Sequence, residues 1–330
     1  MGSSPTFHEI FSAEPDAARG VPFVRFMELA MYHPKVGYYT RKRRRVGLDR
    51  KADFFTATTF SPVFGELVVA AAVHLLGPDA NPADYDLVEI GAEPNAGAFR
   101  DVAHPFARYR RISYGQSLEA TGRCVVFSNE LFDAQPFHRV VWRRDAWREL
   151  GVALGADGQL QEVEMPGHSP ELAAWLDRLP RTSTEDYHLD LPLRTVPLLE
   201  RIIAPAWRGL FLAFDYGKHW EQLAEEHPAG TARTYSHQKQ GNDLLLRPGQ
   251  VDLTCHICWD WLVDALQLGG FGQAKVESHE AFFVKRASAK LAEIMAAEAH
   301  GFSRRKQALL QLIHPGNMGQ KFQALYALRK

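Results

Sequence analysis

YDLVEIGAEPNAGAF, residues 85–99, contains a short apolar run that ends in Glu89-Ile90-Gly91. The run is typical of a buried strand, and the turn after it is typical of the start of a nucleotide-binding loop. Such a loop normally has further glycines at alternate positions, but Glu93 and Asn95 stand there, and glycine returns only at Gly97. We therefore expect a loop of the cofactor-binding type whose contacts with a ligand are weakened.

Two further apolar runs end in polar residues. Residues 124–128 lead into Asn129-Glu130, and residues 210–214 lead into Asp215-Tyr216-Gly217. Helical patterns lie between these strands, so the chain is predicted to be an α/β protein with a mostly parallel sheet covered on both faces. Because ligands bind outside the carboxyl ends of such strands, the three polar ends should converge on one cleft.

The other expected elements follow from apolar spacing and capping residues. Ser61 is predicted to cap a helix that starts at Pro62 and ends before Gly77. Apolar spacing also predicts helices over 22–32, 193–207 and 259–268, and strands over 137–143, 158–164 and 274–278. A last strand over 322–329 is expected only from the resemblance described below.

Composition limits the class of protein. The 330 residues are 46% hydrophobic and 23% charged, with a net charge of −1, which is ordinary for a globular protein and argues against nucleic acid or an anionic membrane as partner. Three cysteines and the absence of a recognisable signal peptide predict a cytoplasmic location. Cys255 and Cys258 have metal-ligand spacing, but no second pair occurs, so we expect no metal site.

Several strings along the chain resemble the MidA family of S-adenosylmethionine-dependent methyltransferases, whose mitochondrial members help assemble respiratory complex I. The resemblance runs nearly end to end and keeps the family's order. The strings that carry it are FMELAMYHPKVGYY (26–39), DFFTATTFSPVFGEL (53–67), VEIGA (88–92), SNELFDAQPFHR (128–139), FDYG (214–217), GTARTYSHQ (230–238), RPGQVDLTCHICW (247–259) and HPGNMGQKFQALYALRK (314–330).

The resemblance implies a Rossmann-like sheet of seven strands. Residues 1–84 would form a helical extension over the cofactor cleft, and residues 85–330 the methyltransferase core. Cleft insertions are expected at about 144–190 and 218–256, and a helical insertion at 286–313 before the last strand. The short distance from Glu89 to Asn129 suggests that one strand-helix unit between them is trimmed.

The implied activity is methylation of a protein side chain, arginine in this family, with S-adenosylmethionine as cofactor. Two departures put cofactor binding in question: Glu93 and Asn95 replace glycines, and residues 105–118 lack the carboxylate that normally holds the ribose. The alternative is a pseudo-methyltransferase that keeps the fold to bind a protein partner. The sequence leaves the oligomeric state open.

Candidate site residues follow from both arguments. As catalytic groups we predict Glu130, which would orient a guanidinium, His256 as a base, and Asp215. Each also has a purely structural interpretation, as a turn cap or a buried histidine. The basic run Arg41–Arg45 is expected to be solvated. The predicted cofactor-binding residues are Thr56, Phe64, Gly65, Glu66, Glu89, Gly91, Gly97, Asn129 and Asp133.

Overall fold

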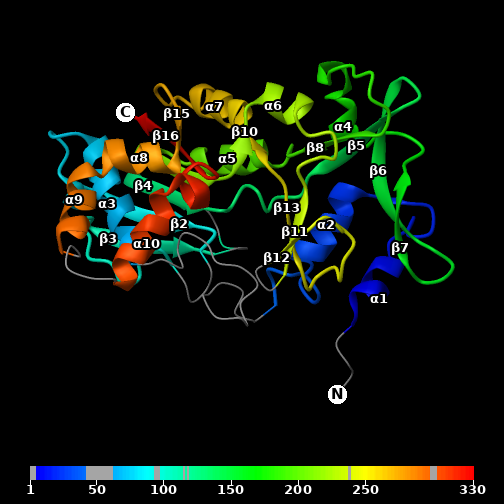
Figure 1. Cartoon of the computed structure of the whole chain (residues 1–330), viewed down its shortest axis with the longest axis horizontal. Coiled ribbons are helices and arrows are strands. Elements are labelled where there is room, and N and C mark those ends of the chain that lie inside the picture. The colour runs from blue at the N-terminus through cyan, green and yellow to red at the C-terminus, as the bar shows by residue number, and fades with distance from the viewer. Residues whose placement is uncertain are drawn as a thin grey trace. The chain divides into compact units, whose positions relative to one another are not determined.

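The computed structural model describes residues 5–41, 62–92, 97–113, 116, 119–236, 239–297 and 303–330. These residues form two compact units, and each unit is built from three separate stretches of the chain (Figure 1). The first unit comprises Met1–Phe54, Asp133–Thr195 and Lys218–Cys258, and the second comprises Phe55–Phe132, Val196–Gly217 and Trp259–Lys330.

The second unit contains a six-stranded sheet in the order β15-β16-β9-β4-β2-β3. Four neighbouring strands are parallel: β2 (Asp86–Ile90), β3 (Arg108–Ile112), β4 (Gly122–Asn129) and β9 (Trp207–Asp215). The two at the other edge, β15 (Lys275–Ser278) and β16 (Gln323–Arg329), are antiparallel to their neighbours. The predicted α/β class is confirmed, but the described residues give this sheet six strands rather than seven. Along the chain, β3 is the one described strand between β2 and β4.

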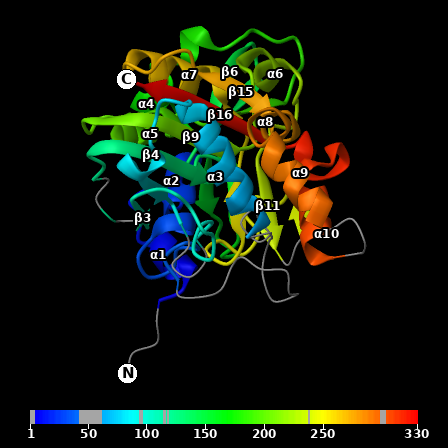
Figure 2. The same cartoon turned by 90° about the vertical axis from the view of Figure 1, so that its left-hand side faces the viewer.

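Helices cover both faces of this sheet (Figure 2), and strand alternation divides the side chains of β9 between them. Leu210, Leu212 and Phe214 pack into the core shared with α3 (Val63–Leu76), α8 (His279–Arg286), α9 (Ser288–Ala297) and α10 (Arg304–Ile313). Phe211 points the other way and meets Phe271, which follows α7 (Trp259–Leu268). The layer on that side also includes α5 (Thr195–Ile203), because Ile203 lies against Gly269.

Two helix boundaries differ from expectation. The predicted cap Ser61 lies outside the described residues, and α3 has Pro62 at its N-cap, without a side-chain hydrogen bond. Helix α5 ends at Ile203 rather than at 207, since Pro205 cannot donate to the helix and Trp207 already begins β9. Helix α7 has the predicted bounds.

The first unit is built around an antiparallel sheet in the order β1-β6-β5-β8, with β7 paired to β6. Helix α2 packs over this sheet and shares a core with α1, in which Phe11, Phe23, Phe26 and Phe137 are fully buried. Sequence patterns missed β6 and β8. The elements are α1 (Phe7–Ser12), β1 (Val21–Pro22), α2 (Phe23–Tyr32), β5 (His138–Arg143), β6 (Ala146–Leu154), β7 (Leu160–Glu164), α4 (Pro170–Ala173), β8 (Tyr187–Leu191), α6 (Trp220–Glu225), β11 (Arg233–Ser236), β12 (Lys239–Gly241) and β13 (Asp252–Thr254), with the short strands β10 (Gly217–Lys218) and β14 (Ile257–Cys258).

Within the described ranges, no helix combines the length and apolar character needed to cross a bilayer. The longest, α3, has 14 residues, whereas a membrane-spanning helix needs about 20.

Leucine-to-alanine substitutions at a buried and at an exposed position should show how much packing in the sheet core contributes to the free energy of unfolding. Leu212 is 0% exposed and Leu268 is 90% exposed. Leu212→Ala should lower the free energy of unfolding by about 2–5 kcal/mol, because it removes buried methyl groups and leaves a cavity. Leu268→Ala should change it by less than about 0.5 kcal/mol. Urea denaturation of both variants tests this, and equal losses would contradict the packing described.

His279 should make the second unit sensitive to acid. Burial lowers the pKa of His279 to about 4, well below its ordinary 6.5, and its Nδ1 lies 2.8 Å from the Leu312 carbonyl oxygen. The unfolded chain therefore binds a proton that the folded chain excludes, and stability falls as the pH drops from 6.5 towards 4. His279→Asn keeps a donor for Leu312 but cannot titrate. Urea unfolding at two pH values should show a smaller acid-induced loss for this variant than for the exposed control His8→Asn.

Candidate functional site at the carboxyl edge of the parallel sheet

The three predicted polar strand ends lie at one edge of the six-stranded sheet. Strand β4 pairs in parallel with both β2 and β9, and the register places Glu89 beside Phe127 and Asn129 beside Phe214. The carboxyl ends of β2, β4 and β9 are therefore immediate neighbours. This is the arrangement expected of a ligand site in an open α/β sheet.

Gly91 ends β2 in a conformation that suits glycine. Its φ of +79° lies in the left-handed region, and a Cβ at this position would come within 2.7 Å of Leu131 Cδ1. Its N–H donates to the carbonyl of Ile112 at 2.9 Å, which fixes the start of the loop to the end of β3. The glycine is thus required by the backbone geometry, independently of any ligand.

Glu130 follows β4 with a left-handed backbone, at φ 49°, which is uncommon for a residue other than glycine. Its N–H donates to the carbonyl of Phe214 at 2.8 Å, and the Asn129 side-chain amide donates to its Oε1 at 3.0 Å. The Glu130 side chain is partly exposed. A partly exposed carboxylate held at a strained turn beyond a parallel strand is a suitable group for binding a cationic substrate.

Asp215 at the end of β9 holds the turn that contains Glu130. It is 0% exposed, and its carboxylate accepts hydrogen bonds from the backbone N–H of Phe132 and of Tyr216, both at 2.9 Å. The structure therefore gives Asp215 a backbone-holding position. Its predicted catalytic role stays a prediction.

Glu89 is buried and joins β2 to β3 and to the far end of the loop. Its carboxylate accepts from the Ala98 N–H at 2.9 and 3.1 Å and from the hydroxyl of Tyr109. Burial raises the pKa of Glu89 above its ordinary value, although these donors and the charge of Arg111 act in the opposite direction. Gly97 is required here, because a Cβ would lie 2.9 Å from Glu89 Oε2 and collide with the Tyr109 hydroxyl.

The predicted cofactor residues on α3 have identifiable packing roles. Phe64 is 0% exposed and packs its ring against Phe127, Phe214 and Phe283. A Cβ on Gly65 would approach Val102 to 2.8 Å, so the glycine allows close packing of the helix. Glu66 forms a two-point ion pair with Arg305, at 2.9 Å to each oxygen. Contact of these residues with a cofactor stays a prediction.

A model of a family of S-adenosyl-L-methionine-dependent methyltransferases matches residues 72–273. The chain belongs to this family. The MidA resemblance is thereby confirmed, and S-adenosylmethionine is the family's cofactor.

Curated relatives agree with this assignment, and a solved structure has the same fold. The mitochondrial protein arginine methyltransferase NDUFAF7 of Mus musculus is 24% identical over an alignment that covers 92% of this chain and 79% of the mouse protein. Its Drosophila melanogaster homolog is 23% identical, with coverage of 92% and 80%. A COG1565 superfamily member from Burkholderia thailandensis, bound to S-adenosyl-homocysteine, shares the fold with a TM-score of 0.84 at 23% identity, covering 98% of this chain and 92% of that chain.

The expected cytoplasmic location is corrected by these relatives. The curated relatives from fly, nematode and mouse are all named as mitochondrial proteins, which points away from the cytoplasm. A low cysteine count could not make this distinction, because a reducing environment is not unique to the cytoplasm.

The remaining predicted residues either lie outside the described residues or belong to the first unit. Thr56, Glu93 and Asn95, and residues 42–45 of the basic run, lie outside the described residues. Asp133 and His256 belong to the first unit. Burial lowers the pKa of His256 to about 4, so its imidazole is neutral at physiological pH, and its ring lies 5.8 Å from that of His227. Cys255 and Cys258 are buried thiols that form no disulfide among the described residues, and these residues hold no cluster of three or more metal-ligating side chains.

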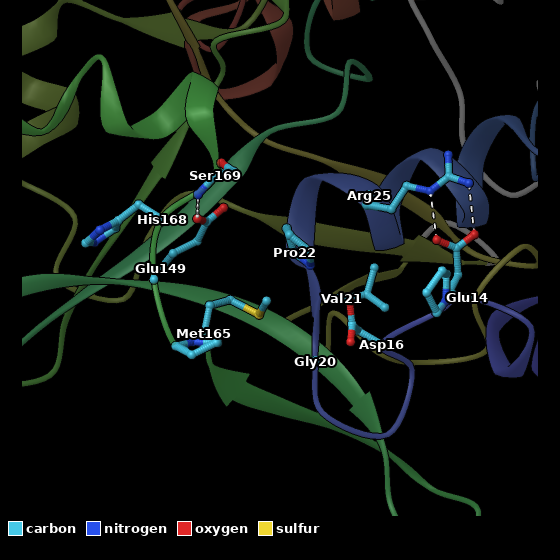
Figure 3. Close-up of a pocket in the computed structure, with 13 residues that line it drawn as sticks. Glu14, Asp16, Gly20, Val21, Pro22, Arg25, Glu149, Met165, His168 and Ser169 are labelled. Atoms are coloured by element: carbon cyan, nitrogen blue, oxygen red, sulfur yellow. Dashed lines mark hydrogen bonds and ion pairs between the residues drawn. The ribbon is translucent and has the colours of Figure 1, made fainter.

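The first unit also has a shallow cavity of about 400 Å³ that none of the predicted residues lines (Figure 3). The buried carboxylate of Glu149 lies against it and is engaged by the Ser169 N–H and by His138 Nδ1, at 3.3 Å for the histidine. On the other side of the cavity, Arg25 is paired with Glu14 at 2.9 Å. The carboxylate of Glu149 and the guanidinium of Arg25 are therefore both held by neighbouring groups.

Sequence reasoning missed Tyr109 and Arg305. Tyr109 lies 20 positions after Glu89, the interval at which a ribose-binding carboxylate was sought. A search for any side chain able to hydrogen-bond at that interval, rather than for carboxylates alone, would have found it. Arg305 carries no comparable sequence signal, because it lies 239 positions from its partner Glu66.

Asp215→Asn should weaken both stability and activity. The amide replaces one acceptor with an N–H that faces a backbone donor, at a cost of about 1–3 kcal/mol in unfolding free energy. The Glu130 turn then loses its support, so methyl transfer should fall in parallel. Urea denaturation and radiolabelled methyl transfer measure the two effects. Full activity in a variant of reduced stability would show that the Asp215 contact does not set the position of Glu130.

Proposed function

We propose that this methyltransferase transfers the methyl group of S-adenosylmethionine to an arginine side chain of a partner protein. The observation that carries the proposal is Glu130, beyond the end of β4. Its backbone N–H donates to Phe214, and its partly exposed carboxylate accepts a hydrogen bond from the Asn129 amide. The names of the mitochondrial relatives support the choice of arginine. These relatives do not favour the alternative of a pseudo-methyltransferase.

The described residues near the loop are compatible with cofactor binding. Gly91 leaves β2 with a positive φ and is exposed, so its backbone is accessible to a ligand. Gly97 is buried, and its lack of a side chain lets the far end of the loop pack against Glu89 and Tyr109. Gly91, Gly97 and Asn129 would lie nearest the cofactor, and Glu89 would hold the loop. When bound, S-adenosylmethionine supplies an electrophilic methyl group.

The chain's own residues would then orient the acceptor. The Glu130 carboxylate can accept two parallel hydrogen bonds from a guanidinium, which fixes the plane of the group and directs one nitrogen. That nitrogen loses one proton as it is methylated, so a base is needed. The Glu130 carboxylate, which would be hydrogen-bonded to the guanidinium, is the proposed acceptor of the proton. Asp215 acts indirectly, through the turn that carries Glu130.

Glu130→Gln should reduce methyl transfer about a hundredfold or more while cofactor affinity and stability are kept. The amide retains the shape but can no longer pair both oxygens with a guanidinium. The assay is transfer of a tritiated methyl group to proteins of a mitochondrial extract, followed by hydrolysis and identification of methylarginine. Calorimetric titration with S-adenosylhomocysteine checks that the cofactor site is intact.

The matched control is Glu293→Gln, the same change at an exposed position on α9. It should match the wild-type protein in both assays. Full transfer by Glu130→Gln would rule out the proposed role of Glu130, and label found only in other methylated amino acids would rule out arginine as the acceptor.

A further inference from the structure

Tyr109 hydrogen-bonds to Glu89, which holds the far end of the cofactor loop. The ribose-binding carboxylate that was expected in this part of the chain is absent from residues 105–118. Tyr109 lies within β3, where its backbone pairs with Leu87 of β2, and its hydroxyl donates to Glu89 Oε2. The side chain that faces the loop from β3 is therefore a phenol directed at a carboxylate.

This hydroxyl completes the binding of a charge that has little access to water. Glu89 is 3% exposed, and an unpaired carboxylate in such a place is unfavourable by several kcal/mol. The Ala98 N–H and the Tyr109 hydroxyl donate to it, and the charge of Arg111 lies near it. The ring of His104 lies against that of Tyr109, with centroids 6.2 Å apart.

We infer that Tyr109 is a positioning residue for the cofactor: its hydroxyl orients Glu89, and Glu89 in turn holds Ala98 at the end of the cofactor loop. The inference rests on the proposed function, because it assumes that the described residues that follow β2 and precede Phe99, among them Gly91 and Ala98, contribute to binding of S-adenosylmethionine. Tyr109 itself need not touch the ligand.

Strand β3 also holds the other end of the loop. The Gly91 N–H donates to Ile112 at 2.9 Å, and the Ser113 hydroxyl donates to the Ala92 carbonyl at 3.4 Å. Both described ends of the loop are thus tied to β3, the beginning through its backbone and the far end through Tyr109 and Glu89. Contacts that fix Gly91, Ala92 and Ala98 before a ligand arrives lower the ordering cost of binding, so they favour affinity.

The experiment compares Tyr109→Phe with Tyr85→Phe, which removes the same hydroxyl from a tyrosine at the opposite end of β2. Both rings are half-buried, but the Tyr85 hydroxyl has no hydrogen-bond partner among the described residues, and its ring packs against the same core. Calorimetric titration with S-adenosylhomocysteine should give a Kd about tenfold weaker for Tyr109→Phe, the loss expected for one hydrogen bond to a charged group. Tyr85→Phe should match the wild-type protein.

A pH series separates positioning from a simple loss of packing. The Tyr109 hydrogen bond lowers the pKa of Glu89, so removing it raises that pKa further. A protonated Glu89 is a poorer acceptor for Ala98, and affinity should therefore begin to fall at a higher pH in Tyr109→Phe than in the wild-type protein. The double variant Tyr109→Phe/Glu89→Gln cannot titrate at this position and should show no such shift.

The outcomes are distinct. A weakened Kd with a shifted pH profile, and with an unchanged kcat at saturating S-adenosylmethionine, supports the inference. If the wild-type protein binds and Tyr109→Phe matches it at every pH, the inference fails while the proposed function stands. If the wild-type protein binds neither ligand up to millimolar concentration, both fail. Thermal unfolding confirms that each variant is folded.

Discussion

The buried carboxylate of Glu89 is the constraint around which the cofactor end of the sheet is arranged. A charge that is 3% exposed must have its acceptor sites filled, and the chain fills them from a neighbouring strand and from the backbone of the loop. Gly97 follows from this, because the space that a Cβ would take is occupied by Glu89 and Tyr109. One electrostatic requirement therefore fixes a strand pair, a loop end and a glycine.

The rest of the second unit makes that edge rigid by apolar packing. Phe64, Phe127, Phe214 and Phe283 come from α3, β4, β9 and α8, and their rings meet with centroids about 5 to 6 Å apart. The two strands in this group are β4 and β9, and Asn129, Glu130 and Asp215 lie at their ends. A site built on the ends of packed strands keeps its geometry without help from a ligand.

The sequence predicted the features that depend on local pattern. The parallel strands were visible as apolar runs, and their polar ends could be placed at one edge because parallel strands end on the same side. Helix α7 had the predicted bounds because its apolar spacing and the glycines after it are also local features of the sequence. Strand β8 and the division into two interleaved units depend on contacts between segments far apart in the chain, as in the pairing of Arg139 with Asp190, 51 positions away, and no local pattern reports them.

The candidate site likewise has features that the local sequence predicts and features that depend on long-range contacts. Glu130, Asp215 and Gly91 follow strands and could be named from the sequence, but their roles within the turn could not. The left-handed backbone of Glu130 is unfavourable by about 1–2 kcal/mol for a residue with a Cβ, and it persists because its N–H bonds to Phe214 while Asp215 holds Phe132 two residues on. The turn is therefore stable only when both hydrogen bonds are present, and the strain at Glu130 is offset in part by Asp215, which lies 85 positions away in the sequence. A residue type at a strand end can suggest chemistry, whereas the long-range hydrogen bonds decide whether it is held in a position to perform it.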